Sequence, residues 1–169
     1  MNGILYIVKG EDERGYETRL KLFNQFEALR GRPLIAYVTS LRPNVFGMME
    51  PDALSSIISR VQAVPKTDAE VDFLIVSDGG DGMMASRTVN ILREKFKKFS
   101  VLVPYAAFSA ATLLSLGADE IITRPFSDLG PWDPQFSETM PTKSGQQETS
   151  RFSAEDIRRY FDFITLICL

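Results

Sequence analysis

The sequence predicts an α/β protein built around a mostly parallel β-sheet, and three observations support this prediction. Strand-like apolar runs alternate along the chain with segments of helical periodicity, as in successive βαβ units. One run, FLIVS over residues 73–77, is apolar almost throughout, which is typical of a strand buried on both faces. The chain has 169 residues, 44% of them apolar, which suits one domain over residues 1–169 with a single core.

Short runs of apolar and β-branched residues predict the strands, and the segments with helical spacing of apolar residues between them predict the helices. The expected strands cover residues 4–8, 34–39, 73–77, 100–104 and 120–123. The expected helices cover residues 16–30, 52–63, 82–99 and 109–116. The first of these helices carries large apolar residues at helical spacing, namely Leu20, Phe23, Phe26 and Leu29. Asp52, which follows a proline, is the expected N-cap of the second helix.

The C-terminal third is predicted to depart from this alternation. Residues 124–150 contain four prolines and few aliphatic side chains, so we expect a long loop there. Ser153 and Asp156 resemble a capping box that begins a last helix. Because that helix stays apolar to its end (FITLICL), we expect either that the chain is part of a longer protein or that this helix docks on another subunit of a homo-oligomer.

Composition excludes several classes of function. A net charge of −3 without a long basic run argues against nucleic acid or an anionic membrane surface as the partner. No segment approaches the length of a transmembrane span, and the first residues do not resemble a secretory signal. With the lone cysteine, Cys168, we therefore expect a reducing, cytoplasmic setting. The absence of histidine excludes histidine-dependent catalysis and histidine-ligated zinc within this chain, and we expect no metal or other cofactor.

Two segments at matching positions of consecutive strand–helix units are candidates for chemistry. Gly79 and Gly80 follow a buried strand and precede a helix, where exposed N–H groups favour an anion. Their spacing is neither a dinucleotide fingerprint nor a P-loop, so a plain glycine-rich turn is the alternative. Ser109 follows the next strand and opens the next helix among alanines. It is either a nucleophile whose oxyanion donors are the N–H groups of Ala110 and a glycine, or simply a helix N-cap.

Four ordered blocks of the sequence resemble one protein family. They are SDGG (residues 77–80), VLVP (101–104), AAFSAATLLSLGADEI (106–121) and SDLGPWDPQ (127–135). The blocks are similar to the serine dehydrogenase proteinase family, within the Clp protease/crotonase superfamily that includes signal peptide peptidase A. This resemblance implies the spiral ClpP/crotonase fold of βαβ units. It also implies that Ser109 is the nucleophile and that the N–H groups of Gly80 (or Gly79) and Ala110 form the oxyanion hole.

The chain departs from the family pattern at two positions close to these residues. Asp78 stands where the family has proline, and its charge would oppose an oxyanion unless the side chain points away. Ala111 stands where the family has glycine, and it adds a methyl group in a tight turn. Neither departure removes a donor N–H group.

Ser109 needs a proton acceptor, which without histidine is a lysine or a carboxylate. The signal peptide peptidase relatives use a Ser–Lys pair, and Lys143 is the one lysine that follows Ser109 here. A lysine pKa of about 10.4 would have to fall by about three units for this role. Asp133 is the second candidate, and a base on another subunit or on further sequence is the third. The ordinary alternatives are a solvated lysine and a turn-forming aspartate.

The leading prediction is therefore a serine peptidase of the Ser–Lys type that acts on peptides or proteins. Two other classes of function remain open. One is a catalytically inactive assembly or peptide-binding domain of the same fold, which would have lost its base. The other is acyl-CoA chemistry of the crotonase kind, which also uses paired backbone N–H groups to hold an oxyanion.

Overall fold

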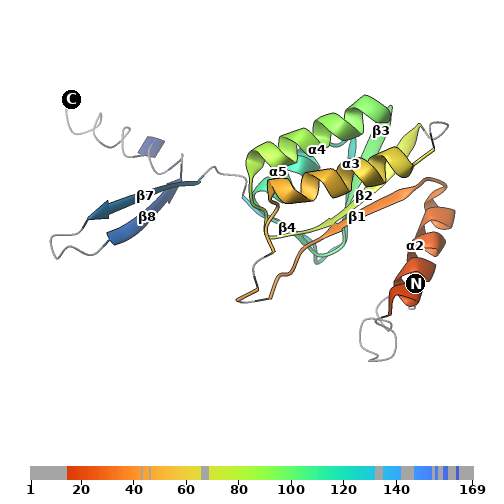
Figure 1. The fold of residues 1–169 in the computed structure, drawn as a ribbon, viewed down its shortest axis with the longest axis horizontal. Coiled ribbons are helices and arrows are strands. Elements are labelled where there is room, and N and C mark those ends of the chain that lie inside the picture. The colour runs from red at the N-terminus through yellow and green to blue at the C-terminus, as the bar shows by residue number, and fades with distance from the viewer. Residues whose placement is uncertain are drawn as a thin grey trace.

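Four parallel strands form the main sheet of the computed structural model, which describes residues 15–42, 44–45, 47–65, 69–131, 135–141, 147–153, 155, 158–159 and 163 (Figure 1). In spatial order the strands are β1 (Leu34–Val38), β2 (Glu70–Val76), β3 (Lys98–Val103) and β5 (Glu120–Thr123). The predicted α/β class with a parallel sheet is thereby confirmed. The strand expected over residues 4–8 lies outside the described residues.

Three helices lie together on one face of this sheet (Figure 1). They are α3 (Leu54–Ala63), α4 (Gly82–Lys95) and α5 (Ala110–Leu116). Each begins after a strand has ended and runs back along the sheet, as the βαβ prediction requires. No described helix combines the length and the apolar character that crossing a membrane requires.

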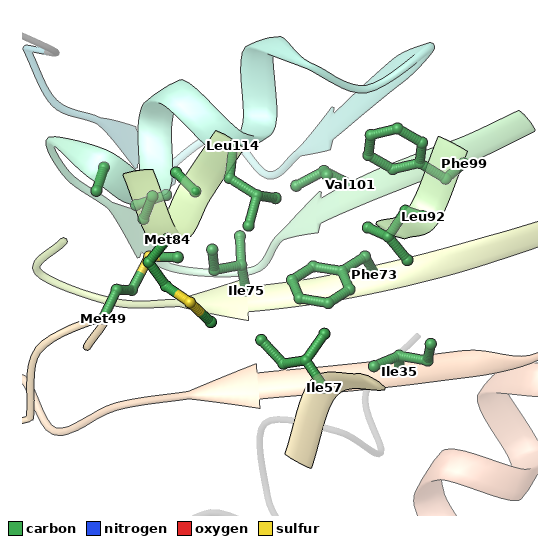
Figure 2. Packing of buried hydrophobic residues seen from close by; sticks show 14 of the residues in the cluster. Ile35, Met49, Ile57, Phe73, Ile75, Met84, Leu92, Phe99, Val101 and Leu114 are labelled. Carbon is green, nitrogen blue, oxygen red and sulfur yellow. The ribbon is translucent and has the colours of Figure 1, made fainter. Parts of the chain in front are cut away.

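The core fills the space between these helices and the sheet (Figure 2). Phe73 and Ile75 of β2 and Val101 of β3 enter it from the strands, and all three are fully buried. Leu92 of α4 and Leu114 of α5 pack against them from the helices. Because alternate residues of a strand point to opposite faces, one row of each strand supplies this core.

The other face of the sheet is less completely covered. Leu74 and Val76, which alternate with the core residues of β2, are half-buried, and Val38 of β1 is 62% exposed. The expectation that the strand over residues 73–77 is buried on both faces is therefore wrong for these side chains. The reason is that α3, α4 and α5 all lie on the opposite face (Figure 1).

Helix α2 (Tyr16–Arg30) covers the predicted range, yet none of its residues is buried. It is attached to the sheet by polar contacts. The Arg30 guanidinium donates to both carboxylate oxygens of the fully buried Asp72, at 2.7 and 3.2 Å. Glu27 accepts a hydrogen bond of 2.7 Å from the Leu34 N–H at the start of β1. An apolar spacing in the sequence thus predicted the helix correctly without predicting how it is held.

Two predicted helix boundaries are wrong. The helix expected over residues 82–99 ends at Lys95, because Phe96 is extended (φ −109°, ψ 142°) and Phe99 pairs with Val71 in the sheet. The helical spacing of apolar residues continues past Lys95, but the residues from Lys98 onward form hydrogen bonds in the sheet as β3 and not in a helix. Asp52 is not an N-cap: it lies inside the 3-10 turn Pro51–Ala53, and the turn and α3 have no side-chain cap.

The long loop predicted over residues 124–150 is also wrong where this stretch is described. It contains β6 (Asp128–Leu129), β7 (Gln135–Pro141) and most of β8 (Gln147–Ser153). Strands β7 and β8 pair in antiparallel register from Gln135 opposite Ser153 to Pro141 opposite Gln147, and the hairpin stands apart from the main sheet (Figure 1). Backbone pairing, which polar residues make as readily as apolar ones, produces this hairpin and leaves little hydrophobic signal in the sequence.

Asp119 joins the end of the α5 unit to the start of β3. Its carboxylate accepts a hydrogen bond of 2.9 Å from the Phe99 N–H and lies 3.3 Å from the Arg93 guanidinium of α4. The Phe99 hydrogen bond is the main reason that the pKa of Asp119 lies below its usual value; burial opposes this effect, and the nearby Arg93 charge adds to it. The ionised carboxylate therefore stabilises the native state.

We expect Asp119→Asn to lower the free energy of unfolding most at neutral pH. The stabilisation is fully present above the unfolded pKa of about 3.9 and is lost as the pH falls through the lower folded pKa, so the two proteins should converge under acidic conditions. Urea denaturation between pH 7 and pH 2 measures this. Glu94→Gln is the control, because that exposed carboxylate makes no hydrogen bond or ion pair with a described residue. A pH-independent difference would contradict the prediction.

Candidate active site

Beyond the carboxyl ends of the main strands, the chain continues into short extended segments that pair with one another. Ser77, just after β2, forms a bridge with Ala107 of β4 (Ala106–Ala107). Strand β4 in turn pairs with β6, so that Ala107 lies opposite Leu129. These pairings bring together three loops from three separate units of the chain. The loops carry the glycine turn, Ser109 and the segment that ends at Pro131.

The glycine turn is packed against the loop of Ser109. Gly79 and Gly80 have φ values of +96° and +148°, which side-chain-bearing residues rarely adopt. A Cβ atom on Gly79 would lie 2.5 Å from the Phe108 carbonyl oxygen and 2.8 Å from the Ser109 Cβ. The sequence therefore needs glycine here for two reasons, backbone conformation and close approach to the serine.

Met49 fixes the direction of the turn through its backbone. Its N–H donates to the Gly79 carbonyl at 2.7 Å, and its carbonyl accepts from the Asp81 N–H at 2.8 Å. The Gly79 carbonyl and the Gly80 N–H belong to one planar trans peptide, so they point in opposite directions. The Gly80 N–H is thus directed away from Met49, and it has no hydrogen-bond acceptor among the described residues.

Ser109 occupies the N-cap position of α5 in a strained conformation. Its φ of 50° and ψ of −116° lie outside the regions favoured by L-residues, which costs about 1 to 3 kcal/mol. The side chain is exposed and makes no capping hydrogen bond. Its N–H donates to the Pro131 carbonyl at 3.1 Å. The predicted helix start is confirmed, but the interpretation of Ser109 as an ordinary capping residue is not supported, because the capping bond is missing.

The Ala110 N–H is a second donor beside the serine. Ala110 is the first residue of α5, and its nitrogen lies 3.1 Å from the position that a Cβ on Gly79 would take. Like the Gly80 N–H, it has no acceptor within the part of the chain that the structure describes. The first N–H groups of a helix carry the positive end of its dipole. The Ala110 N–H directly follows Ser109, and the Gly80 N–H lies in the turn that packs against the serine loop. Backbone N–H groups without an acceptor can bind a developing oxyanion.

Two buried hydroxyls that the sequence analysis did not assign support this geometry. The Ser77 Oγ accepts a hydrogen bond of 3.1 Å from the Gly79 N–H. The Thr112 hydroxyl donates to the Ala107 carbonyl at 2.7 Å and lies 2.9 Å from the Gly130 carbonyl, so it joins β4 to the segment after β6. A serine two residues before a glycine is a recognisable turn pattern. Nothing in the sequence marks Met49, because it acts through its backbone.

The structure describes only some of the other residues that the sequence analysis discusses near the site. Asp78 is exposed and makes no hydrogen bond or ion pair with a described residue, and Ala111 is fully buried in the core. Lys143 and Asp133, the candidate bases, lie outside the described residues. Within the described ranges, no three cysteine or acidic side chains cluster as metal ligands would.

We expect Gly79→Ala and Gly80→Ala each to lower the free energy of unfolding by about 2 to 4 kcal/mol, because backbone strain and overpacking add. Gly82→Ala is the control, because Gly82 follows the turn as the first residue of α4 and the nearest neighbour of an added Cβ would be a Leu113 methyl carbon at 3.8 Å. It should change stability by less than about 1 kcal/mol. Urea denaturation compares the three variants, and equal effects at all three positions would refute this account of the turn.

Comparison with known proteins identifies a family. A family model described as ClpP-like SDH-type serine proteinase matches residues 18–167. Two uncharacterised proteins of Methanocaldococcus jannaschii are similar: MJ1495 is 28% identical over 126 residues, and MJ0137 is 35% identical over 82 residues. These matches cover 71% and 48% of this chain but only 43% and 28% of the relatives, so the chain spans less than half of their length.

A solved structure is also similar, the ClpP protease catalytic domain from Plasmodium falciparum, at 12% identity and a TM-score of 0.45. The match covers 63% of this chain and 61% of that one. The family model extends over most of the chain and includes the glycine turn and the strained serine. It confirms the resemblance found in the sequence: this chain belongs to the family of ClpP-like SDH-type serine proteinases.

Proposed function

We propose that this chain is a serine peptidase in which Ser109 is the nucleophile and the N–H groups of Gly80 and Ala110 form the oxyanion hole. The observation that carries the proposal is the strained, exposed Ser109, with the Ala110 N–H next to it and the glycine turn packed against its loop. Neither the Ala110 N–H nor the Gly80 N–H has an acceptor among the described residues. Strained backbone persists only where its surroundings impose it, and it is concentrated at active sites. Membership of a serine proteinase family supports the same reaction class.

Gly80 is the better candidate for the second donor than Gly79. The Gly79 N–H already donates to the Ser77 hydroxyl, so it is occupied. The Gly80 N–H belongs to the peptide that Met49 holds through the Gly79 carbonyl, and it is unengaged by described residues. A donor that is held in place and has no partner costs little reorganisation when an oxyanion forms.

The proposed reaction is acyl transfer in two steps. The Ser109 Oγ forms a bond to the peptide carbonyl carbon while its proton passes to the general base, and the carbonyl oxygen becomes the oxyanion held by the two N–H groups. The C–N bond then breaks, and the base returns the proton to the leaving amine. Water hydrolyses the resulting ester by the same route. The substrate is an extended peptide that pairs with backbone groups near the glycine turn.

Lys143 and Asp133 remain the candidate bases within this chain. Lys143 is the choice that the Ser–Lys relatives imply. Asp133 is only two residues along the chain from Pro131, whose carbonyl accepts the Ser109 N–H, and this connection supports it as the second choice. A peptide-binding domain without catalysis is the alternative function, and the charge of Asp78 next to the glycine turn favours it, because a negative charge opposes an oxyanion.

We expect a fluorophosphonate probe to label the chain at Ser109, because the probe needs an activated hydroxyl and an oxyanion hole. Ser109→Ala should abolish labelling. Ser86→Ala, which removes an exposed serine on α4, should leave it unchanged. Mass spectrometry of the labelled peptide locates the site. If the wild-type chain is not labelled under conditions that label a known serine hydrolase, the peptidase is rejected in favour of the binding domain.

The pH dependence of peptide hydrolysis identifies the base. If Lys143 is the base, activity should be weak at neutral pH and rise towards pH 10, because an ordinary lysine pKa lies near about 10.4 and only the neutral amine accepts a proton. Lys143→Ala should then remove activity as completely as Ser109→Ala. Rates measured from pH 6 to pH 10 on the wild type, Lys143→Ala and Asp133→Asn test this. Loss in Asp133→Asn alone would reject Lys143.

A further inference from the structure

Ser77 is held rigidly between two parts of the proposed site. Its N–H donates to the Ala106 carbonyl at 3.1 Å, and its carbonyl accepts from the Phe108 N–H at 3.0 Å. Its backbone is thus tied on both sides to the loop that ends in Ser109, and the residue is completely buried. A group that is hydrogen-bonded to the Ser77 side chain is therefore fixed in position relative to the loop of Ser109.

The Ser77 hydroxyl has two hydrogen-bond partners. It accepts from the Gly79 N–H at 3.1 Å and from the Thr39 hydroxyl, which follows β1, at 3.0 Å. Gly79 is buried, so its N–H needs an acceptor, and removing a buried acceptor is costly. Gly79 is also free of the steric limits that a side chain imposes, so without this bond its peptide has other conformations within reach.

We infer that Ser77 is a positioning residue for the oxyanion hole. Its hydroxyl fixes the Gly79 N–H, while the Met49 N–H fixes the Gly79 carbonyl, so both polar groups of Gly79 are held. The Gly80 N–H lies in the same peptide plane as that carbonyl and is fixed with it. Ser77 acts through this turn and not on substrate. The inference rests on the proposed function, because it concerns the donor that the proposal assigns to Gly80.

The test compares Ser77→Ala with Ser115→Ala in the full chain. Ser115 is also a fully buried serine with one short hydrogen bond, 2.7 Å to the Ala111 carbonyl, but it lies towards the far end of α5. We expect the fluorophosphonate labelling rate of Ser109 to fall about tenfold in Ser77→Ala, less than the 10²- to 10³-fold loss typical when a donor itself is removed. In Ser115→Ala the rate should stay within about twofold of wild type.

Hydrogen exchange measured by mass spectrometry gives a readout independent of reactivity. Exchange over residues 77–82 should rise in Ser77→Ala and stay unchanged in Ser115→Ala. Each variant is measured at the same interval below its own melting temperature, so that a difference in global stability does not account for the result. An unlabelled wild type refutes the proposed function and this role with it. A labelled wild type whose Ser77→Ala variant reacts at the same rate, or shows unchanged exchange over residues 77–82, overturns this inference alone.

Discussion

The backbone pairing just beyond the main sheet is the constraint on which the site depends. Ser77 pairs with Ala107, and Ala107 pairs with Leu129, so the ends of three successive units are joined side by side. Ser77 and Ala107, which are 30 positions apart in the chain, thereby lie side by side. Each of these pairs is made by N–H and C=O groups that must find partners when buried, which makes the arrangement insensitive to the identity of many side chains.

The same pairing sustains the strained backbone of Ser109. Its N–H is engaged by the Pro131 carbonyl, and its own carbonyl accepts from the Leu113 N–H at 3.0 Å. Both polar groups of the Ser109 backbone are therefore held, and relaxation to a common conformation would have to break these bonds. The strain is offset by these bonds, and it leaves the side chain exposed at the start of α5.

Far from the site, at the opposite ends of the strands, polar contacts replace apolar packing. Asp72, fully buried in β2, is paired with Arg30, and Ser100 of β3 donates to Glu120 of β5 at 2.9 Å. Arg32 lies 3.0 Å from Glu70 in the same group. A buried carboxylate is tolerated only when it is paired, so the attachment of α2 depends on charge and not on its apolar spacing.

Much of this protein could be predicted from its sequence, because apolar periodicity reports which residues must leave water. The parallel sheet follows from apolar runs that burial enforces in β2 and β3. The ends of α2 and β5 and the helix start at Ser109 follow from local sequence patterns, although α2 and β5 contain no buried residue. The need for glycine at positions 79 and 80 is also local, since residues with a side chain rarely adopt those φ values. Where a pattern continued past an element, as at Phe99, or where pairing was polar, as in β7 and β8, the sequence alone misled.

Only the tertiary structure decided which groups face one another. The direction of the Gly80 N–H depends on Met49, which the order of residues does not mark. The Ser77–Gly79 spacing is a recognisable turn pattern, but only the structure shows that the Ser77 hydroxyl holds the Gly79 N–H next to the loop of Ser109. The reason is physical. Every residue has a backbone carbonyl, and every residue except proline has a backbone N–H, so side-chain identity does not determine which backbone groups pair. The packing of distant segments determines it.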